Sequence, residues 1–150
     1  MKIYLASRYS RRLEMCELKC RLESLGHTVT SRWLLGGHQW NGDAKETIDQ
    51  YESGGMPVMA VRCAQDDIND IRAADTVIAF PDPPREPSTS RGGMHVELGF
   101  ALGLGKRVIV CGIRQNFFHL LPEIQFFDSK STLIEELGRL KSKTRCNHEQ

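Results

Sequence analysis

The sequence lacks a long apolar run, a cysteine cluster and an excess of charge of either sign. Its 150 residues include 20 Lys and Arg against 19 Asp and Glu, which gives a net charge of +1. Proteins that bind a nucleic acid polymer normally carry a basic face or stripe, so this balance argues against that class. No apolar stretch approaches the roughly 18 residues of a membrane span, and the first residues turn polar too early for a signal peptide. We therefore expect a cytoplasmic protein that binds neither a membrane nor a nucleic acid polymer.

Cysteines are scattered along the chain. They stand at Cys16, Cys20, Cys63, Cys111 and Cys146. Their odd number and the absence of a CxxC pair support neither a disulfide framework nor a zinc site. The sequence also has no GxGxxG after its first apolar run and no P-loop motif, so a dinucleotide or ATP bound in those ways is unsupported. We predict that the protein uses no metal and no redox cofactor.

What the sequence does contain is an alternation of apolar strands and helical patterns. The strand patterns cover residues 2–6, 27–33, 76–80, 107–111 and 124–127, and the helical patterns cover 9–25, 58–74, 92–104, 116–121 and 131–143. Several strands are apolar throughout, which is typical of a parallel sheet with helices on both faces. We predict one α/β domain over residues 1–145, flavodoxin-like or Rossmann-like, with five mainly parallel strands. A polar tail, 146–150, is expected to fray.

Ligands of such sheets bind outside the carboxyl ends of the strands. The segment 87–99 joins a predicted strand end to a helix start and contains Gly92 and Gly93. Glycines, hydroxyls, an arginine and a helix N-terminus favour an anion such as phosphate. Glu97 then falls near the first turn of the helix and faces the ligand crevice. Alternatively, Glu97 only complements the helix dipole.

Two further carboxylates lie where a ligand would meet them. Asp82 follows the apolar strand at 76–80, and Asp67 lies in a helical segment. A nucleophilic carboxylate with a second acid nearby can cleave a glycosidic bond through a covalent sugar ester. The alternatives are that Asp82 is an ordinary turn residue and that Asp67, with Asp66 and Asp70, forms a solvated helix face.

Four segments in order resemble the nucleoside 2-deoxyribosyltransferase family. They are Lys2–Ser7, Asp67–Ile71, Phe80–Asp82, and Gly93–Ala101 followed by Gly105–Val108. The family includes 2′-deoxynucleoside 5′-phosphate N-hydrolases and CMP N-glycosidases. The resemblance covers most of residues 2–111, and its order fits the predicted fold.

The resemblance implies roles for four residues. Glu97 matches the nucleophile that attacks C1′ of the sugar, and Tyr4 matches the hydroxyl that orients and helps to ionise it. Asp82 and Asp67 match acids that contact the leaving base and assist its protonation, which suits an oxocarbenium-like centre. Water or another base then releases the glycosyl ester. The expected function is cleavage or exchange at the N-glycosidic bond of a nucleoside 5′-monophosphate or (2′-deoxy)nucleoside.

The substrate class depends on groups around the crevice. Hydroxyls and cations gather at Ser7, Arg8, Ser88, Ser90 and Arg91. They exceed what a 5′-hydroxyl requires and favour a 5′-monophosphate, although the first loop differs from the Gly-rich loop of the phosphohydrolase branch. Arg11 and Arg12 follow in the first helical pattern, and they are alternatively only solvated side chains on the face of that helix. The rival functions are base exchange between free deoxynucleosides, cleavage of the nicotinamide glycosidic bond of NAD and, in another class, a non-catalytic nucleotide sensor.

His95 departs from the family pattern, in which glycine commonly stands two residues before the glutamate. Its side chain is expected to narrow the pocket, touch the base or only cap the helix. Four aromatic residues, Trp33, His38, Trp40 and Tyr51, frame a long loop at 34–57. One of them is a candidate to stack on the base, whereas Trp33 also suits the edge of the core.

The last candidate concerns the quaternary structure. Asn116 lies roughly where deoxyribosyltransferases place an asparagine that reaches the substrate of a neighbouring subunit. The resemblance thus implies a homodimer or higher homo-oligomer with a shared active site, with Phe117, Phe118 and Leu121 as contact residues. The same three apolar residues are alternatively part of the core.

Overall fold

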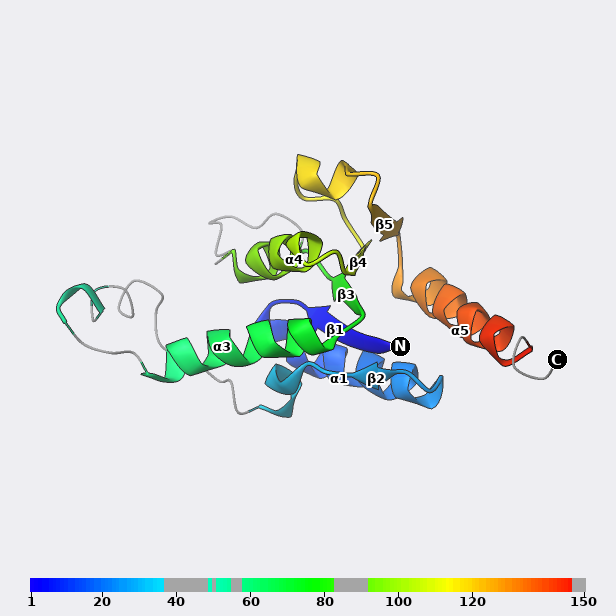
Figure 1. Cartoon of the computed structure of the whole chain (residues 1–150), viewed down its shortest axis with the longest axis horizontal. Helices are drawn as coiled ribbons and strands as arrows, with labels where there is room; N and C mark the ends of the chain where they lie inside the picture. The colour runs from blue at the N-terminus through cyan, green and yellow to red at the C-terminus, as the bar shows by residue number, and fades with distance from the viewer. Residues whose placement is uncertain (37–48, 50, 55–57, 83–91, 147–150) are drawn as a thin grey trace.

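A five-stranded parallel sheet forms the centre of the molecule (Figure 1). The computed structural model describes residues 1–36, 49, 51–54, 58–82 and 92–146. The strands are β1 (Lys2–Ala6), β2 (Thr28–Val29), β3 (Thr76–Ala79), β4 (Arg107–Cys111) and β5 (Ile124–Phe127). Their order is β2-β1-β3-β4-β5, and every neighbouring pair is parallel. This confirms the predicted α/β class and strand number.

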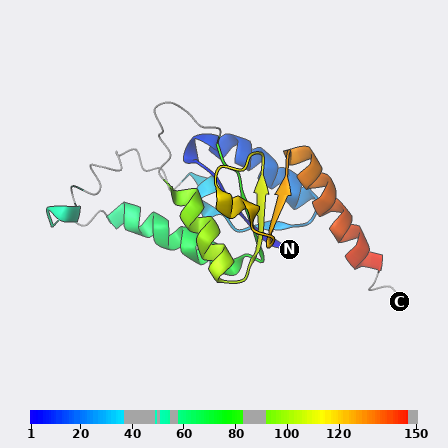
Figure 2. The same ribbon diagram turned by 90° about the horizontal axis from the view of Figure 1, so that it is seen from above.

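Helices cover both faces of this sheet, as the apolar strands predict (Figure 2). The α-helices are α1 (Arg12–Ser24), α3 (Val58–Ala73), α4 (Gly93–Gly103) and α5 (Lys130–Cys146). Short 3₁₀ helices are η1 (Tyr9–Arg11), η2 (Arg32–Leu35) and η3 (Phe117–Leu120). α3 and α4 pack together on one face, and α1 and α5 lie on the other. Among the described helices, none is both long and apolar enough to cross a membrane.

The core lies on the three central strands. Ile3–Ala6 of β1, Val77–Ala79 of β3 and Val108–Val110 of β4 are fully buried. A strand with helices on both faces has no solvated side, so its residues are apolar without alternation. The same burial explains why these strands could be recognised as short continuous apolar runs.

The strand order reverses between β1 and β3. From β1 the chain crosses to β2 at one edge, and from β3 it crosses to β4 on the other side. The crossovers diverge at this switch point and leave a crevice outside the carboxyl ends of the two strands. Ser7 follows β1, and the segment that leads to α4 follows β3. These are the segments in which the sequence analysis places the ligand site.

The second strand is shorter than the predicted 27–33, which is a correction. After Thr30, the chain forms hydrogen bonds to the backbone of β1 through side chains and no longer through its own backbone groups. The Leu5 N–H donates to Ser31 Oγ at 2.7 Å, and Trp33 Nε1 donates to the Leu5 carbonyl at 2.9 Å. Because these groups satisfy the backbone of β1, the chain is free to turn into η2.

Helix boundaries also differ from the prediction at both ends of the chain. The first helical pattern begins with η1 before α1 starts at Arg12. The last helix reaches Cys146 and thus extends past the predicted end at 143. Such shifts at helix ends are small, and they leave the order of the elements as predicted.

Candidate active site

The hydroxyl of Tyr4 binds the carboxylate of Glu97, a residue 93 positions away in the sequence. Tyr4 Oη donates to Glu97 Oε1 at 2.8 Å. Tyr4 is fully buried within β1, and its backbone is held in the sheet opposite Val77 of β3. A phenol anchored in a central strand has little freedom, so it fixes the position of the carboxylate.

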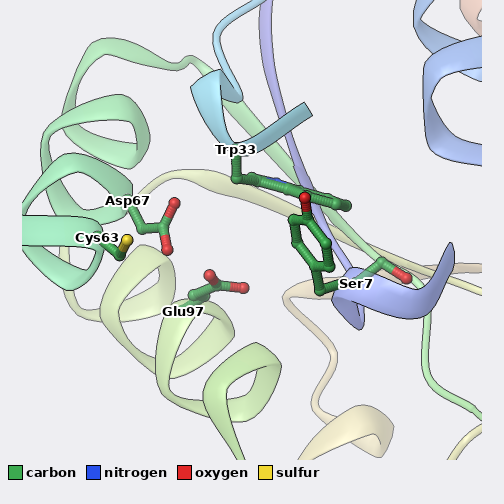
Figure 3. A pocket seen from close by; sticks show the side chains of 6 residues that line it. Ser7, Trp33, Cys63, Asp67 and Glu97 are labelled. Carbon is green, nitrogen blue, oxygen red and sulfur yellow. The ribbon is translucent and has the colours of Figure 1, made fainter. Parts of the chain in front are cut away.

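Glu97 reaches the crevice because of how α4 begins. Gly92 has a φ of +73°, a left-handed conformation that favours glycine, and α4 starts at Gly93. Glu97 lies about one turn into the helix and points toward α3 and the end of β1 (Figure 3). The neighbouring Val96 is exposed to solvent on another side of α4.

A cavity of about 160 Å³ surrounds the free side of this carboxylate. It is lined by Ser7, Tyr9, Trp33, Cys63, Asp67 and Glu97, which come from the segment after β1 and from η1, η2, α3 and α4. In Figure 3 the side chains of Asp67 and Glu97 point toward one another across it. Two of the four predicted catalytic residues thus share one cavity, and a third, Tyr4, bonds to its wall.

Burial and like charge control the protonation of this cluster. Burial and, after it, the negative charge of Asp67 together raise the pKa of Glu97 to about 7, while the hydrogen bond from Tyr4 acts in the opposite direction. The pKa of Tyr4 is also raised, by burial and then by the charges of Glu97 and Asp67. The phenol therefore keeps its proton and remains a donor at neutral pH.

Cys63 forms part of the cavity wall one helical turn before Asp67. Both residues lie on the same side of α3, because positions i and i+4 of a helix are neighbours. Burial raises the pKa of the Cys63 thiol, and the charge of Asp67 raises it further. The thiol is thus a neutral group in the wall at physiological pH.

Asp82 belongs to a cluster of its own at the end of β3. Its carboxylate pairs with Arg8 at 3.0 Å and with Arg11 at 3.3 Å. Arg11 also donates to the carbonyl of Phe80, and the side chain of Gln115 donates to the carbonyl of Asp82. The cavity lining within the described ranges does not include Asp82.

Ser7 presents a hydroxyl that nothing in the described part of the chain satisfies. Its Oγ is buried at the cavity and has no hydrogen-bond partner there. A buried polar atom of this kind usually has a partner, so a polar group of a ligand suits this position. The other predicted anion-binding residues, Ser88, Ser90 and Arg91, lie outside the described residues, as do His38 and Trp40.

His95 and Asn116 contact each other instead of lining the described cavity. Asn116 Nδ2 lies 3.3 Å from His95 Nδ1, and Asn116 Oδ1 accepts from the Phe118 N–H at 3.0 Å, which caps η3. The His95 ring lies beside that of His119, with centroids 5.7 Å apart. Both ends of the Asn116 amide are therefore occupied within its own chain.

The aromatic candidates fall in different environments. Trp33 is buried and closes the core edge through its bond to Leu5; it also lines the cavity, so stacking on the base stays a prediction for this residue. Tyr51 is exposed and away from this lining. Phe117 and Phe118 are 74% and 54% exposed, so they are surface residues and not core.

Two residues of the cavity wall were not selected from the sequence. Cys63 stands four residues before Asp67, and this spacing would have indicated that both residues share one helix face. Tyr9 lies two residues after Ser7 and packs against Trp33, with ring centroids 6.3 Å apart. Across the described residues, His, Cys, Asp and Glu form no group of three or more that could hold a metal ion.

Comparisons with known proteins identify the family and the fold. The family model for nucleoside 2-deoxyribosyltransferase matches residues 3–120. A search of curated proteins finds no match. Similar solved structures include the CMP N-glycosidase BcmB of Clostridium botulinum, which is 20% identical, with a TM-score of 0.54 over 91% of this chain and 98% of that chain.

Two other solved structures share the fold. The 2-deoxyribosyltransferase of Bacillus psychrosaccharolyticus is 21% identical, with a TM-score of 0.62 over 89% of this chain and 90% of that chain. A conserved protein of Enterococcus faecalis V583 is 16% identical, with a TM-score of 0.59 over 93% of this chain and 98% of that chain. At these identities the likeness concerns the fold.

Proposed function

The chain belongs to the nucleoside 2-deoxyribosyltransferase family, and on that basis we propose that it cleaves an N-glycosidic bond through a covalent glycosyl ester of Glu97. The substrate is a nucleoside 5′-monophosphate or a (2′-deoxy)nucleoside. The observation that carries this proposal is the hydrogen bond from Tyr4 to Glu97 at a cavity that Asp67 also lines. These groups supply a nucleophile, a residue that orients it and a second acid.

In the first step, Glu97 attacks C1′ of the sugar as the base departs. The bond between the carboxylate oxygen and C1′ forms, and the bond between C1′ and the base nitrogen breaks with its electron pair leaving on the base. Tyr4 holds Oε1, which directs Oε2 toward the substrate. A carboxylate beside an oxocarbenium-like centre both stabilises the positive charge and traps it.

Asp67 supplies the proton that the leaving base needs. Its negative charge helps to raise the pKa of Glu97 to about 7. For turnover, Glu97 must be ionised while the Asp67 carboxyl group passes a proton to the nitrogen of the leaving base. In the second step, water or an acceptor base attacks C1′, its proton passes to the Asp67 carboxylate, and the bond between C1′ and the Glu97 oxygen breaks.

Asp82 is predicted to act as a further acid on the leaving base, and its ion pairs support an additional role in positioning cations. It holds Arg8 and Arg11 beside the end of β3, where a 5′-phosphate would lie. We infer that Arg8 and the Ser7 hydroxyl bind the phosphate, together with Ser88, Ser90, Arg91 and the helix start at Gly92 and Gly93. The unsatisfied Ser7 Oγ supports this assignment.

Ser7→Ala tests the phosphate assignment. The loss of one hydrogen bond to a charged group is expected to raise KM for nucleoside 5′-monophosphates about tenfold. KM for the corresponding nucleosides should stay the same, since they carry no phosphate. Ser24→Ala, which changes an exposed serine at the end of α1, is the matched control. An equal change for both substrate classes would contradict phosphate binding by Ser7.

The active enzyme is proposed to be a cytoplasmic homodimer or higher homo-oligomer. The exposed side chains of Phe117, Phe118 and Leu121 support self-association, because apolar surface clusters are typical of interfaces. His95 and Asn116 lie at the base of this surface, next to the start of α4. A neighbouring subunit bound there would approach the site from the η3 side.

A panel of substrates tests the proposed function. Free base is measured by chromatography after incubation with nucleosides, 2′-deoxynucleosides and their 5′-monophosphates, with and without an acceptor base. Release without an acceptor establishes an N-hydrolase, and exchange that requires an acceptor establishes a transferase. Glu97→Ala should abolish either reaction while leaving substrate binding measurable. Binding without turnover by the unaltered enzyme would instead support a nucleotide sensor.

A further inference from the structure

The segment Ser31–Trp33 joins β1 to α3 through three consecutive side chains. Ser31 Oγ and Trp33 Nε1 bind the N–H and the carbonyl of Leu5, at 2.7 and 2.9 Å. Both side chains are buried. Two of the three residues therefore dock the segment on the backbone next to Tyr4.

The middle residue, Arg32, binds α3. Its Nε donates to Asp70 Oδ1 at 2.7 Å, and its backbone N–H donates to Asp70 Oδ2 at 2.8 Å. Nη1 pairs with the Asp66 carboxylate at 3.1 Å, and Nη2 donates to the Asp66 carbonyl at 3.1 Å. A planar guanidinium held at three nitrogens fixes both the position and the rotation of the helix that it binds.

These contacts flank two of the three residues that the mechanism uses. Leu5 adjoins Tyr4 on β1, while Asp66 adjoins Asp67 on α3. Asp70 follows Asp67 by nearly one helical turn, so both carboxylates that bind Arg32 are neighbours of Asp67 on the helix. The segment thus sets the separation of Asp67 from Tyr4, and through Tyr4 from Glu97.

We propose that Arg32 is a positioning residue that holds Asp67 at its working distance from Tyr4 and Glu97. The inference rests on the proposed function. Arg32 is not among the described residues that line the cavity, and it acts on the reaction through Asp66 and Asp70. Its neighbour Trp33 lines the cavity, so the same segment also places an aromatic wall.

The contribution of Arg32 is geometric more than stabilising. Its side chain is 46% exposed, so solvent weakens its ion pairs, and the buried carboxylate of Asp70 keeps a second partner in the backbone N–H of Arg32. Its charge nevertheless offsets those of Asp66 and Asp70, so an informative variant must keep the charge and change the geometry. Arg32→Lys does this, because a single ammonium group cannot reproduce three separate nitrogen contacts.

The expected signature is a change in the titration of Glu97. Among the described residues, the titratable groups around Glu97 are Tyr4 from β1, Tyr9 from η1, and Asp67 and Cys63 from α3. After burial, the charge of Asp67 contributes most to the raised pKa of Glu97. If Asp67 moves away in Arg32→Lys, the pKa of Glu97 falls from about 7 toward its ordinary value of 4.5.

Carbon NMR of glutamate labelled at the carboxyl carbon measures this pKa without any need for turnover. The Glu97 signal is assigned with Glu97→Gln and titrated in the unaltered protein and in Arg32→Lys. Arg107→Lys is the matched control, because the guanidinium of Arg107 likewise makes contacts through more than one nitrogen, with Gln125, at the opposite end of the sheet. We expect a lower pKa in Arg32→Lys alone, with kcat reduced about tenfold or more and KM within about threefold.

In a second variant, Arg32→Gln, loss of the charge and displacement of Asp67 change the pKa of Glu97 in opposite directions. Removal of a positive charge alone raises the pKa of a carboxyl group, whereas displacement of Asp67 lowers that of Glu97. A fall in Arg32→Gln therefore also supports positioning. An unchanged Glu97 pKa in Arg32→Lys, with kcat unchanged or lowered only in proportion to the folded fraction, overturns the inference. A lowered pKa in a protein that releases no base supports the positioning and rejects the proposed function instead.

Discussion

At the scale of single residues, the shared proton chemistry of Tyr4, Asp67 and Glu97 is the central feature. A buried carboxylate with a raised pKa commonly marks a functional site, because burial without compensation serves no structural purpose. The contact between Tyr4 and Glu97 partly offsets that cost. These three residues thus combine a nucleophile, Glu97, whose pKa is about 7, with a hydrogen-bond donor, Tyr4, that keeps its proton at neutral pH.

Tyr4→Phe tests the orienting role of the phenol. The ring still fills its place in β1, but Glu97 loses the hydrogen bond that lowers its pKa, so that pKa should rise above about 7. We expect kcat at neutral pH to fall about ten- to a hundredfold, which corresponds to one lost hydrogen bond to a charged group. The pH profile of kcat checks this, with Tyr51→Phe, a change at an exposed tyrosine, as the control. An unshifted acid limb would argue against the role.

The raised pKa of Glu97 also has a consequence for stability. Its carboxyl has a folded-state pKa of about 7 against 4.5 in the unfolded chain, so its stabilising contribution is complete below pH 4.5 and is lost as the pH rises through 7. Relative to Glu97→Gln, the free energy of unfolding should fall over this window by an amount on the order of 3 kcal/mol. Denaturant unfolding of both proteins at several pH values measures the difference. Parallel pH curves for the two proteins would contradict the burial argument.

The sequence predicted individual site residues better than their contacts. Glu97 and Asp67 were selected from their positions in the chain and Tyr4 through the family resemblance, and the structure brings the three together. Asp82 was also selected from its position, but its partners Arg8 and Arg11 come from a segment whose course no periodicity reveals. The roles of all these residues remain predictions. Cys63 was missed because a cysteine in a helical pattern looks the same whether it faces a cavity or the core.

At the scale of secondary structure elements, η2 connects the sheet to the site. The apolar runs predicted β1, β3 and β4, because strands covered on both faces have no polar residues to interrupt the pattern. The end of β2 was not predictable, since it depends on side-chain bonds from Ser31 and Trp33 to Leu5. Such bonds join segments that are 26 and 28 residues apart.

Trp33→Phe tests how η2 docks on β1. Phenylalanine keeps an aromatic ring at the cavity but leaves the Leu5 carbonyl without its partner. The expected loss in unfolding free energy is about 1–3 kcal/mol, the cost of a buried acceptor without a hydrogen bond. Denaturant titration provides the value, and Phe100→Leu, a change at a partly buried residue of α4, is a comparison for lost aromatic volume without a lost hydrogen bond. No loss of stability in Trp33→Phe would mean that the bond is dispensable for docking.

At the scale of the whole molecule, the strand order determines where chemistry takes place. The order β2-β1-β3-β4-β5 puts the switch point between β1 and β3, and the described cavity lies beside the end of β1. The sequence predicted the parallel class because apolar strands alternate with helices. It did not specify which surface is left uncovered, and Phe117 and Phe118 are exposed beside the His95 and Asn116 contact.

The central claim is that Glu97 becomes covalently bonded to the sugar. The measurement is mass spectrometry of the enzyme quenched with the best substrate of the panel and with its 2′-fluoro analogue. Fluorine destabilises the positive charge at C1′, which slows both formation and breakdown of the ester. The account predicts a mass increase equal to one glycosyl group on the peptide that contains Glu97, and no increase in Glu97→Ala. Base release without an adduct, or an adduct on Asp67 instead, would contradict it.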